Sequence, residues 1–99
     1  MNLSDTVEIM NSSDYKDRFK AEYYQLKIRT CGLDNMLNKW DREKLTFNPT
    51  CPRSTYALQL RAMRDYMAIL EMRAIMEGIE LDTSLEGCQN DRQEIYVRM

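Results

Sequence analysis

The chain has 99 residues, 43% hydrophobic and 30% charged, with a formal net charge of −2. This balance is typical of one small globular domain and excludes a disordered chain. The near-neutral total gives no reason to expect binding to DNA. No apolar run approaches the roughly 20 residues of a membrane span, and the N-terminus lacks a signal-peptide pattern. We therefore expect a cytoplasmic protein without a membrane partner.

Residues typical of catalysis and metal binding are scarce. The chain has no histidine, and its glycines are too isolated to form a phosphate-binding loop. The three cysteines are Cys31, Cys51 and Cys88. They form no CxxC pair, so we interpret them as reduced thiols and not as metal ligands. These features predict no catalytic residues, no metal and no cofactor.

Residues 1–14 are polar and acidic, with a short apolar cluster at Val7, Ile9 and Met10. This pattern predicts an N-terminal arm or one helical turn. Ser13 or Asp14 then provides an N-cap for a helix that begins at Tyr15.

From Tyr15 to about Trp40, apolar residues follow a heptad spacing of 4 and 3, which predicts a helix of roughly 25 residues. The positions are Phe19, Tyr23, Leu26, Thr30, Leu33, Leu37 and Trp40. Gly32 lies inside this helix and suggests a kink or a close contact with another helix. In residues 41–52, Pro49 and Pro52 exclude a helix interior. We expect Leu45 and Phe47 to fold this connection onto the helices.

A second helix is predicted from Pro52 to about Glu77, and Gly78 is a natural end for it. Its heptad positions are Tyr56, Leu60, Met63, Met67, Leu70 and Ala74. Further apolar residues lie outside this stripe: Leu58, Tyr66, Ile69, Met72, Ile75 and Met76. Two helices alone cover only one stripe of each partner, so this surface predicts self-association or another protein partner.

The predicted fold is therefore all-α, with a two-helix antiparallel hairpin over residues 15–81. The N-terminal arm (1–14) precedes it and a C-terminal tail (82–99) follows. The tail is acidic, and its end alternates weakly, so that residues 94–99 fit either a short strand or a docked segment.

Basic residues in both helices are interleaved with tyrosines. Cations paired with aromatic rings suit the recognition of phosphates and nucleobases. The simpler interpretation is that these cations lie on solvated helix faces and form ordinary pairs within a helix. Tyr23 and Tyr56 occupy heptad positions and are expected in the core, whereas Tyr15 lies four residues before the first heptad position.

Two segments resemble the hairpins of phage anti-defence sponges, a family that includes the anti-CBASS sponge and part of a Thoeris anti-defence sponge. They are residues 15–29 (YKDRFKAEYYQLKIR) and residues 58–75 (LQLRAMRDYMAILEMRAI), and the likeness covers residues 15–81. The resemblance implies a homo-oligomer, with six copies expected, that sequesters cyclic oligonucleotide immune signals in the host cytoplasm without cleaving them.

The resemblance also implies ligand-binding residues. Tyr15, with Lys16 beside it, corresponds to an aromatic residue that stacks on a base of a cyclic dinucleotide. In the family, a basic residue further along the first helix meets the phosphates. The corresponding positions here, near Cys31 and Gly32, are not basic, so Lys27 or Arg29 is the candidate for this role. Two residues of the second helix correspond to arginines that bind cyclic trinucleotides: Arg61 and Arg64. A cyclic ADP-ribose signal requires a further C-terminal domain in this family, and this chain is too short for a full one.

Two other functions also fit this sequence. One is a helical protein-interaction module, an inhibitor or adaptor that binds a partner helix through its methionine-rich stripe. The other is a small phage structural protein with no nucleotide ligand.

Overall fold

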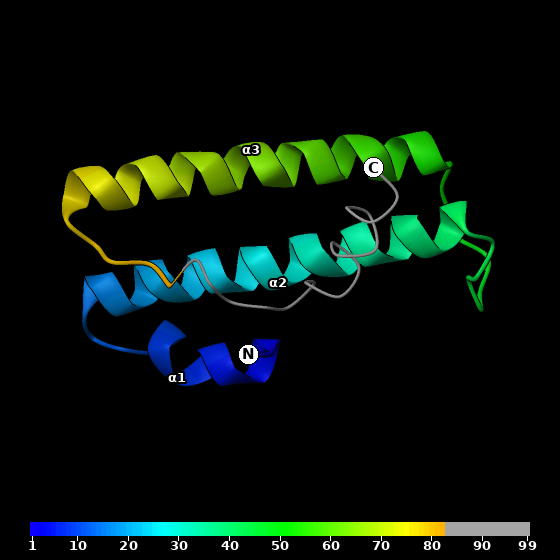
Figure 1. Ribbon diagram of the computed structural model, residues 1–99. Coiled ribbons are helices and arrows are strands. Elements are labelled where there is room, and N and C mark those ends of the chain that lie inside the picture. The colour runs from blue at the N-terminus through cyan, green and yellow to red at the C-terminus, as the bar shows by residue number, and fades with distance from the viewer. Residues whose placement is uncertain (83–99) are drawn as a thin grey trace.

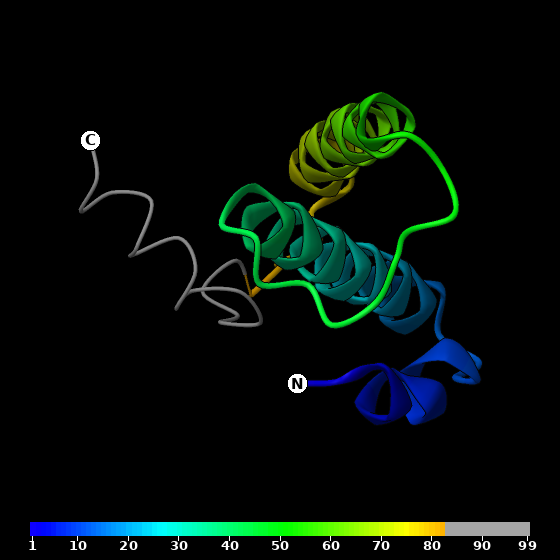
Figure 2. The ribbon, with the colours of Figure 1, turned by 90° about the vertical axis from the view of Figure 1, so that its right-hand side faces the viewer.

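The computed structural model describes residues 1–82, and all regular elements within them are helices (Figure 1). They are the 3₁₀ helix η1 (Leu3–Thr6), α1 (Val7–Met10), α2 (Tyr15–Asp41) and α3 (Arg53–Glu77). The long helices α2 and α3 run antiparallel, and the arm formed by η1 and α1 lies against α2 on the side away from α3 (Figures 1 and 2). The prediction of an all-α hairpin is confirmed for these residues.

The helix ends follow local sequence signals. The Asp14 carboxylate accepts a hydrogen bond from the Lys16 backbone N–H at 2.9 Å, so Asp14 is the N-cap of α2. Gly78 ends α3 with a φ of 69°, a left-handed conformation that favours glycine. The Ile79 N–H then donates to the Ala74 carbonyl at 2.8 Å, which closes the last turn. Pro52 is the residue immediately before α3 and not its first helical residue.

The hydrophobic core lies at one end of the hairpin. Its buried members are Phe19, Tyr23, Tyr24, Leu70, Ala74 and Ile79. Ile9 of the arm and Leu81 after α3 pack against this cluster, so the core combines three layers where the arm, α2 and α3 meet. The predicted heptad stripes face this core and the α2–α3 contact, and none of their members is fully exposed.

Tyrosine–glutamate hydrogen bonds connect α2 with α3. The pairs are Tyr15 with Glu77, Tyr23 with Glu71, and Tyr66 with Glu22. The Tyr23 hydroxyl donates to Glu71 Oε2 at 2.6 Å, and its ring is only 1% exposed. Burial, followed by this hydrogen bond, raises the pKa of Tyr23, so the phenol stays protonated.

The N-terminal arm is docked through polar contacts. Thr6 is completely buried, and its hydroxyl accepts a hydrogen bond from Gln25 Nε2 at 2.9 Å. Ser12 Oγ donates to Asp17 Oδ2 at 2.9 Å, and Arg18 Nη1 donates to the Ser12 carbonyl at 2.8 Å. These contacts fix residues 1–14 on α2.

Three expectations about single residues are wrong. Phe47 is 53% exposed and does not cover the hairpin, although Leu45 is half-buried. A Cβ placed on Gly32 would meet no described atom within 4 Å, so the expected close contact with another helix is absent there, while the alternative of a kink stays a prediction. Cys31 is buried and disulfide-bonded, whereas Cys51 is an exposed free thiol; the prediction of reduced thiols therefore fails for Cys31.

Two further findings concern membrane-spanning helices and the C-terminal tail. No helix in residues 1–82 is long and apolar enough to cross a membrane. The expected tail, including the strand or docked segment at 94–99, lies outside the described residues apart from Asp82, whose backbone N–H donates to the Tyr24 hydroxyl at 3.1 Å.

Candidate functional site

Tyr15 lies in a polar cluster at the open end of the hairpin, where α2 begins and α3 ends. Its side chain is 47% exposed, and its hydroxyl donates to Glu77 Oε1 at 2.7 Å and accepts from Arg73 Nη2 at 2.9 Å. Arg73 also bonds to Glu77, from Nε to Oε2 at 3.1 Å, and its guanidinium lies 5.0 Å from the centre of the Phe19 ring. We call these four residues the Tyr15 cluster.

The hydrogen bonds of the Tyr15 cluster stabilise its charges. The bond donated by Tyr15 lowers the pKa of Glu77, and Arg73 lowers it further. The bond to Glu77 raises the pKa of Arg73, and the same carboxylate raises the pKa of Tyr15. The cluster therefore holds a charged Arg73–Glu77 pair beside a neutral phenol.

A surface hollow of about 320 Å³ opens beside this cluster. It is lined by Met10, Tyr15, Arg18, Phe19, Glu22 and Arg73. The two guanidiniums can meet phosphate oxygens, and the exposed Tyr15 ring can stack on a base. The arrangement suits a nucleotide.

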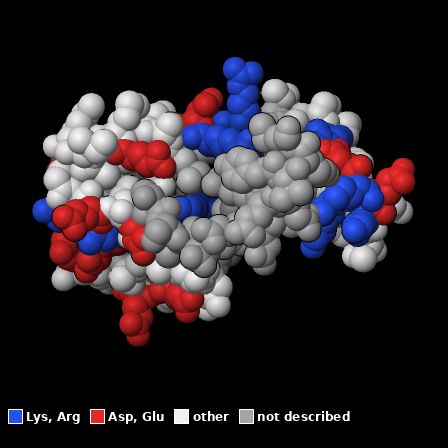
Figure 3. All heavy atoms as spheres, viewed as in Figure 1, with Lys and Arg blue, Asp and Glu red and all other residues white. Residues whose placement is uncertain are grey.

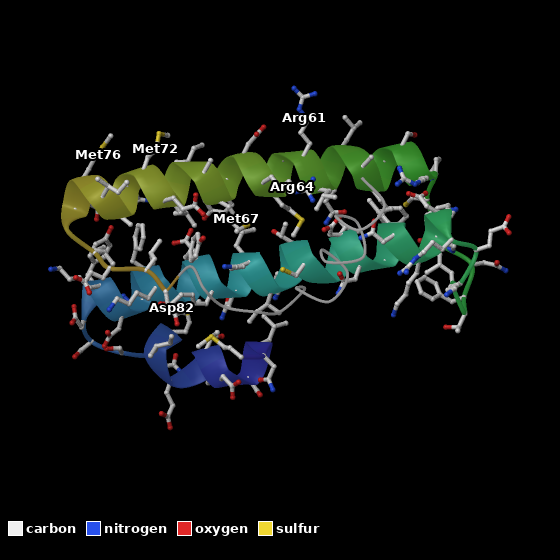
Figure 4. The ribbon with its side chains drawn as sticks, in the orientation of Figure 1. Arg61, Arg64, Met67, Met72, Met76 and Asp82 are labelled. Carbon is white, nitrogen blue, oxygen red and sulfur yellow. The ribbon has the colours of Figure 1, made fainter. Side chains whose placement is uncertain are left out.

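A second hollow of about 430 Å³ lies towards the other end of the hairpin. We call it the arginine hollow, because its lining includes three arginines of α3, namely Arg53, Arg61 and Arg64. Arg64 points towards α2 and pairs with the buried Asp34 at 3.3 Å, whereas Arg61 points away from α2 (Figure 4). Arg53 bonds to both carboxylate oxygens of Asp41 at 2.8 Å. Among residues 1–82, Arg61 forms no ion pair, so its charge is available to a ligand.

Asn38 lines the same hollow and carries an unsatisfied donor. Its Nδ2 atom is buried and has no hydrogen-bond partner among residues 1–82. A buried donor without a partner costs free energy, which a phosphate or base oxygen could recover on binding. This atom gives the arginine hollow a second feature that suits an anionic ligand.

Lys27 and Arg64 line a third, smaller hollow of about 180 Å³ together with Met67. Lys27 and Arg29 do not share a site with Tyr15 in one chain. At 1.5 Å per residue they lie about 18 and 21 Å along α2 from Tyr15. Lys16 and Arg29 are exposed and line none of the hollows described above.

Sequence analysis did not identify Arg73 and Glu77 as partners of Tyr15. Both residues belong to the last turn of the second predicted helix, and an antiparallel hairpin brings that turn opposite Tyr15. Their spacing of four residues also predicts an ion pair on one helix face. The sequence therefore contains a signal for the Arg73–Glu77 pair. Placing that pair beside Tyr15 requires knowing which residues of α2 and α3 lie opposite each other in the hairpin.

The outer face of α3 is apolar over its C-terminal half. We define this face by Ile69, Met72, Ile75 and Met76, all of which are exposed. Met72 and Met76 point away from α2, and the corresponding surface carries little charge (Figures 3 and 4). A run of large exposed apolar side chains is characteristic of a protein–protein contact.

Comparison with known proteins identifies a family. A family model described as Sequestin matches residues 13–76. The matched segment spans all of α2 and nearly all of α3, and it includes Tyr15, Arg61 and Arg64. No curated protein and no solved structure matches the chain.

Proposed function

We propose, because this chain belongs to the Sequestin family, that it captures cyclic oligonucleotide signals and holds them unchanged. The family match carries this proposal, since it covers more than half of the chain and implies sequestration in place of catalysis. It also agrees with the resemblance to phage anti-defence sponges found in the sequence. The ligand class and its binding residues are our inference.

The Tyr15 cluster supports a cyclic dinucleotide as one ligand. The exposed Tyr15 ring offers a stacking surface worth about 1–3 kcal/mol per base. Arg73 supplies a guanidinium beside that ring, and a phosphate would compete with Glu77 for it. Arg73 therefore joins Tyr15 in the candidate site.

The arginine hollow supports a second ligand, such as a cyclic trinucleotide. Arg61 has no ionic partner within the described residues. Arg64 pairs with Asp34 at 3.3 Å, and the rest of its guanidinium can bind a ligand. Three phosphates need several cations, and this hollow concentrates three arginines with an unsatisfied Asn38 donor. A cyclic ADP-ribose signal is the less favoured ligand, because the resemblance links that signal to a further C-terminal domain.

Self-association completes the proposal. The outer face of α3 is exposed in one chain, and burying it against other copies would remove apolar surface from water. Lys27 or Arg29 could then reach a dinucleotide stacked on Tyr15 of a neighbouring copy, although they lie too far away within one chain. We propose a homo-oligomer, with the hexamer implied by the resemblance, acting in the host cytoplasm during phage infection.

Thermal stabilisation by cyclic nucleotides tests the function. The purified protein would be melted alone and with cyclic di-AMP, cyclic tri-AMP or cyclic ADP-ribose. A ligand at a hundredfold excess over its Kd should stabilise the folded state by about 2.7 kcal/mol. Stabilisation by a cyclic di- or trinucleotide supports the proposal.

The control ligands are the linear dinucleotide pApA and ATP, which carry the same base and phosphates without the closed ring. If no cyclic nucleotide raises the melting temperature above these controls, the sponge proposal is wrong. The exposed outer face of α3 would then favour the alternative of a protein-interaction module.

A further inference from the structure

A separate hollow of about 450 Å³ lies at the other end of α2, where the chain turns towards α3. Its polar and aromatic members are Lys39, Arg42, Lys44 and Phe47, and we call it the loop pocket. Gly32, Met36, Leu45 and Thr46 complete its wall. Lys39 and Tyr15 are about 36 Å apart along α2, so this pocket is remote from the Tyr15 cluster.

The backbone after α2 brings these cations together. The Lys44 N–H donates to the Lys39 carbonyl at 2.8 Å, and the Glu43 N–H donates to the Trp40 carbonyl at 3.0 Å. Glu43 adopts a φ of 58°, a left-handed conformation that is uncommon for a non-glycine residue. The chain therefore folds back over the last turn of α2 and holds Lys44 beside it.

Among the described residues, the lining of the loop pocket includes three basic side chains and no carboxylate. Asp41, the acidic residue at the end of α2, is engaged by Arg53 through two bonds of 2.8 Å. Figure 3 shows lysine and arginine side chains gathered at the end of the molecule that carries the α2–α3 connection, with acidic side chains at its edge. Lys39 and Lys44 are exposed on this pocket and present two positive charges to a ligand.

Favourable interaction with the C-terminal dipole of α2 explains one or two cations at this position. It does not explain Phe47, which is exposed on the same pocket although burial would stabilise it. An exposed aromatic ring beside convergent cations is the combination that binds a base and its phosphate. The volume also falls within the roughly 300–1,000 Å³ of small-molecule sites.

We propose that the loop pocket binds a nucleoside phosphate. Lys39 and Lys44 hold the phosphate oxygens, and the Phe47 ring stacks on the base. This site is additional to the proposed sponge sites, shares no residue with them and does not depend on their function. Each copy of the chain carries it within a single hairpin.

Equilibrium titration of the full-length protein tests the site with three probes: AMP, inorganic phosphate and adenosine. AMP should bind saturably and at least about tenfold more tightly than either fragment, because only AMP uses both the cations and the ring. Lys44→Ala and Phe47→Ala should each weaken AMP binding about tenfold or more. Both side chains are exposed, so circular dichroism should show unchanged helix content.

Lys20→Ala is the matched control, since it removes one positive charge near the opposite end of α2. Lys20→Ala should leave AMP affinity unchanged. If AMP does not bind saturably, or if Lys44→Ala and Phe47→Ala bind it as tightly as the unmodified protein, the loop pocket is not a nucleotide site. An equal loss in Lys20→Ala would show non-specific attraction to a basic chain and would also overturn the proposal.

Discussion

At the scale of single residues, tyrosine hydroxyls and glutamate carboxylates form the polar contacts between the two long helices. Tyr23 is buried and serves the fold, whereas Tyr15 forms the same kind of bond from an exposed position. The hydroxyl of Tyr15 therefore has a structural role, while its ring remains accessible. This division allows the contribution of the ring to be measured separately from that of the hydroxyl.

Tyr15→Phe and Tyr15→Ala separate the two roles. Phenylalanine keeps the ring but removes the bonds to Glu77 and Arg73, so it should lower the melting temperature and keep affinity for a cyclic dinucleotide within about threefold. Alanine also removes stacking and should weaken binding about tenfold or more. Calorimetric titration measures both variants. Unchanged affinity per folded protein in Tyr15→Ala would show that the ring only packs at the helix start.

Replacement of Lys27 or Arg29 tests the missing phosphate contact. A charge-assisted bond to phosphate is roughly twice as strong as a neutral one, so Lys27→Ala or Arg29→Ala should weaken cyclic dinucleotide binding about tenfold. The variant that loses affinity identifies the residue, and calorimetry of the folded protein provides the comparison. Full affinity in both variants would remove these residues from the site and leave Arg73 as the principal cation.

Glu77 makes stability depend on pH in a defined direction. Its pKa in the folded protein lies below its ordinary value of 4.5, mainly because Tyr15 donates a hydrogen bond to it. Its stabilising contribution is therefore fully present above pH 4.5 and is lost as the pH falls through the lower folded pKa. Glu77→Gln should melt at a lower temperature than the unmodified protein near neutral pH, and the two melting temperatures should converge in acid. A difference that stays constant down to acidic pH would contradict this role.

At the scale of elements, local signals in the sequence predict the helices well. Asp14, Pro52 and Gly78 set boundaries that the structure reproduces within about one residue. These signals act within a few residues of each helix end, so no knowledge of the tertiary fold is needed. The heptad stripes also predict which faces of α2 and α3 meet.

Contacts between distant segments were harder to predict. Tyr15 meets Glu77 across 62 positions, and this pairing depends on the length of the turn and the exact register of α3. The docking of the arm likewise depends on Thr6 and Gln25, two polar residues with no periodic pattern. The candidate site was therefore only partly predictable: Tyr15 was identified, but its partners were not.

Leu70 provides a quantitative test of the hairpin core. It is 0% exposed between α2 and α3, so Leu70→Ala should reduce the free energy of unfolding by about 2–5 kcal/mol. Leu3→Ala, the same change at an exposed position of the arm, should cost less than about 1 kcal/mol. Urea denaturation of both variants at one protein concentration gives the comparison. Equal losses would mean that the core does not lie where the structure places it.

At the scale of the whole molecule, the hairpin buries one side of α3 and leaves the other uncovered. Ile75 and Met76 are 83% and 80% exposed, so the single chain gains nothing from their apolar side chains. Self-association would give this face a partner, and in the proposed function Lys27 or Arg29 of one copy reaches a ligand stacked on Tyr15 of another. Assembly and ligand binding are thus linked in the proposed function.

Charged substitutions on this face test the assembly. Ile75→Glu and Met76→Glu add a charge where a partner would pack, and should convert an oligomer into monomers of about 12 kDa, since the chain mass is 11.8 kDa. Helix content should persist because both side chains are exposed in the hairpin. Ser54→Glu adds the same charge near the start of α3 as a control. Sedimentation showing a folded monomer for the unmodified protein at micromolar concentration would remove the assembly from the account.

Recovery of the ligand tests the central claim of sequestration most directly. The protein would be incubated with a cyclic dinucleotide, separated from free ligand by gel filtration and then denatured, and the released nucleotide would be analysed by chromatography. The account predicts that the nucleotide co-elutes with the protein and is recovered intact, because the described site residues include no activated nucleophile or metal cluster. Linear product would identify an enzyme, and failure of the nucleotide to co-elute would show that the chain does not sequester it.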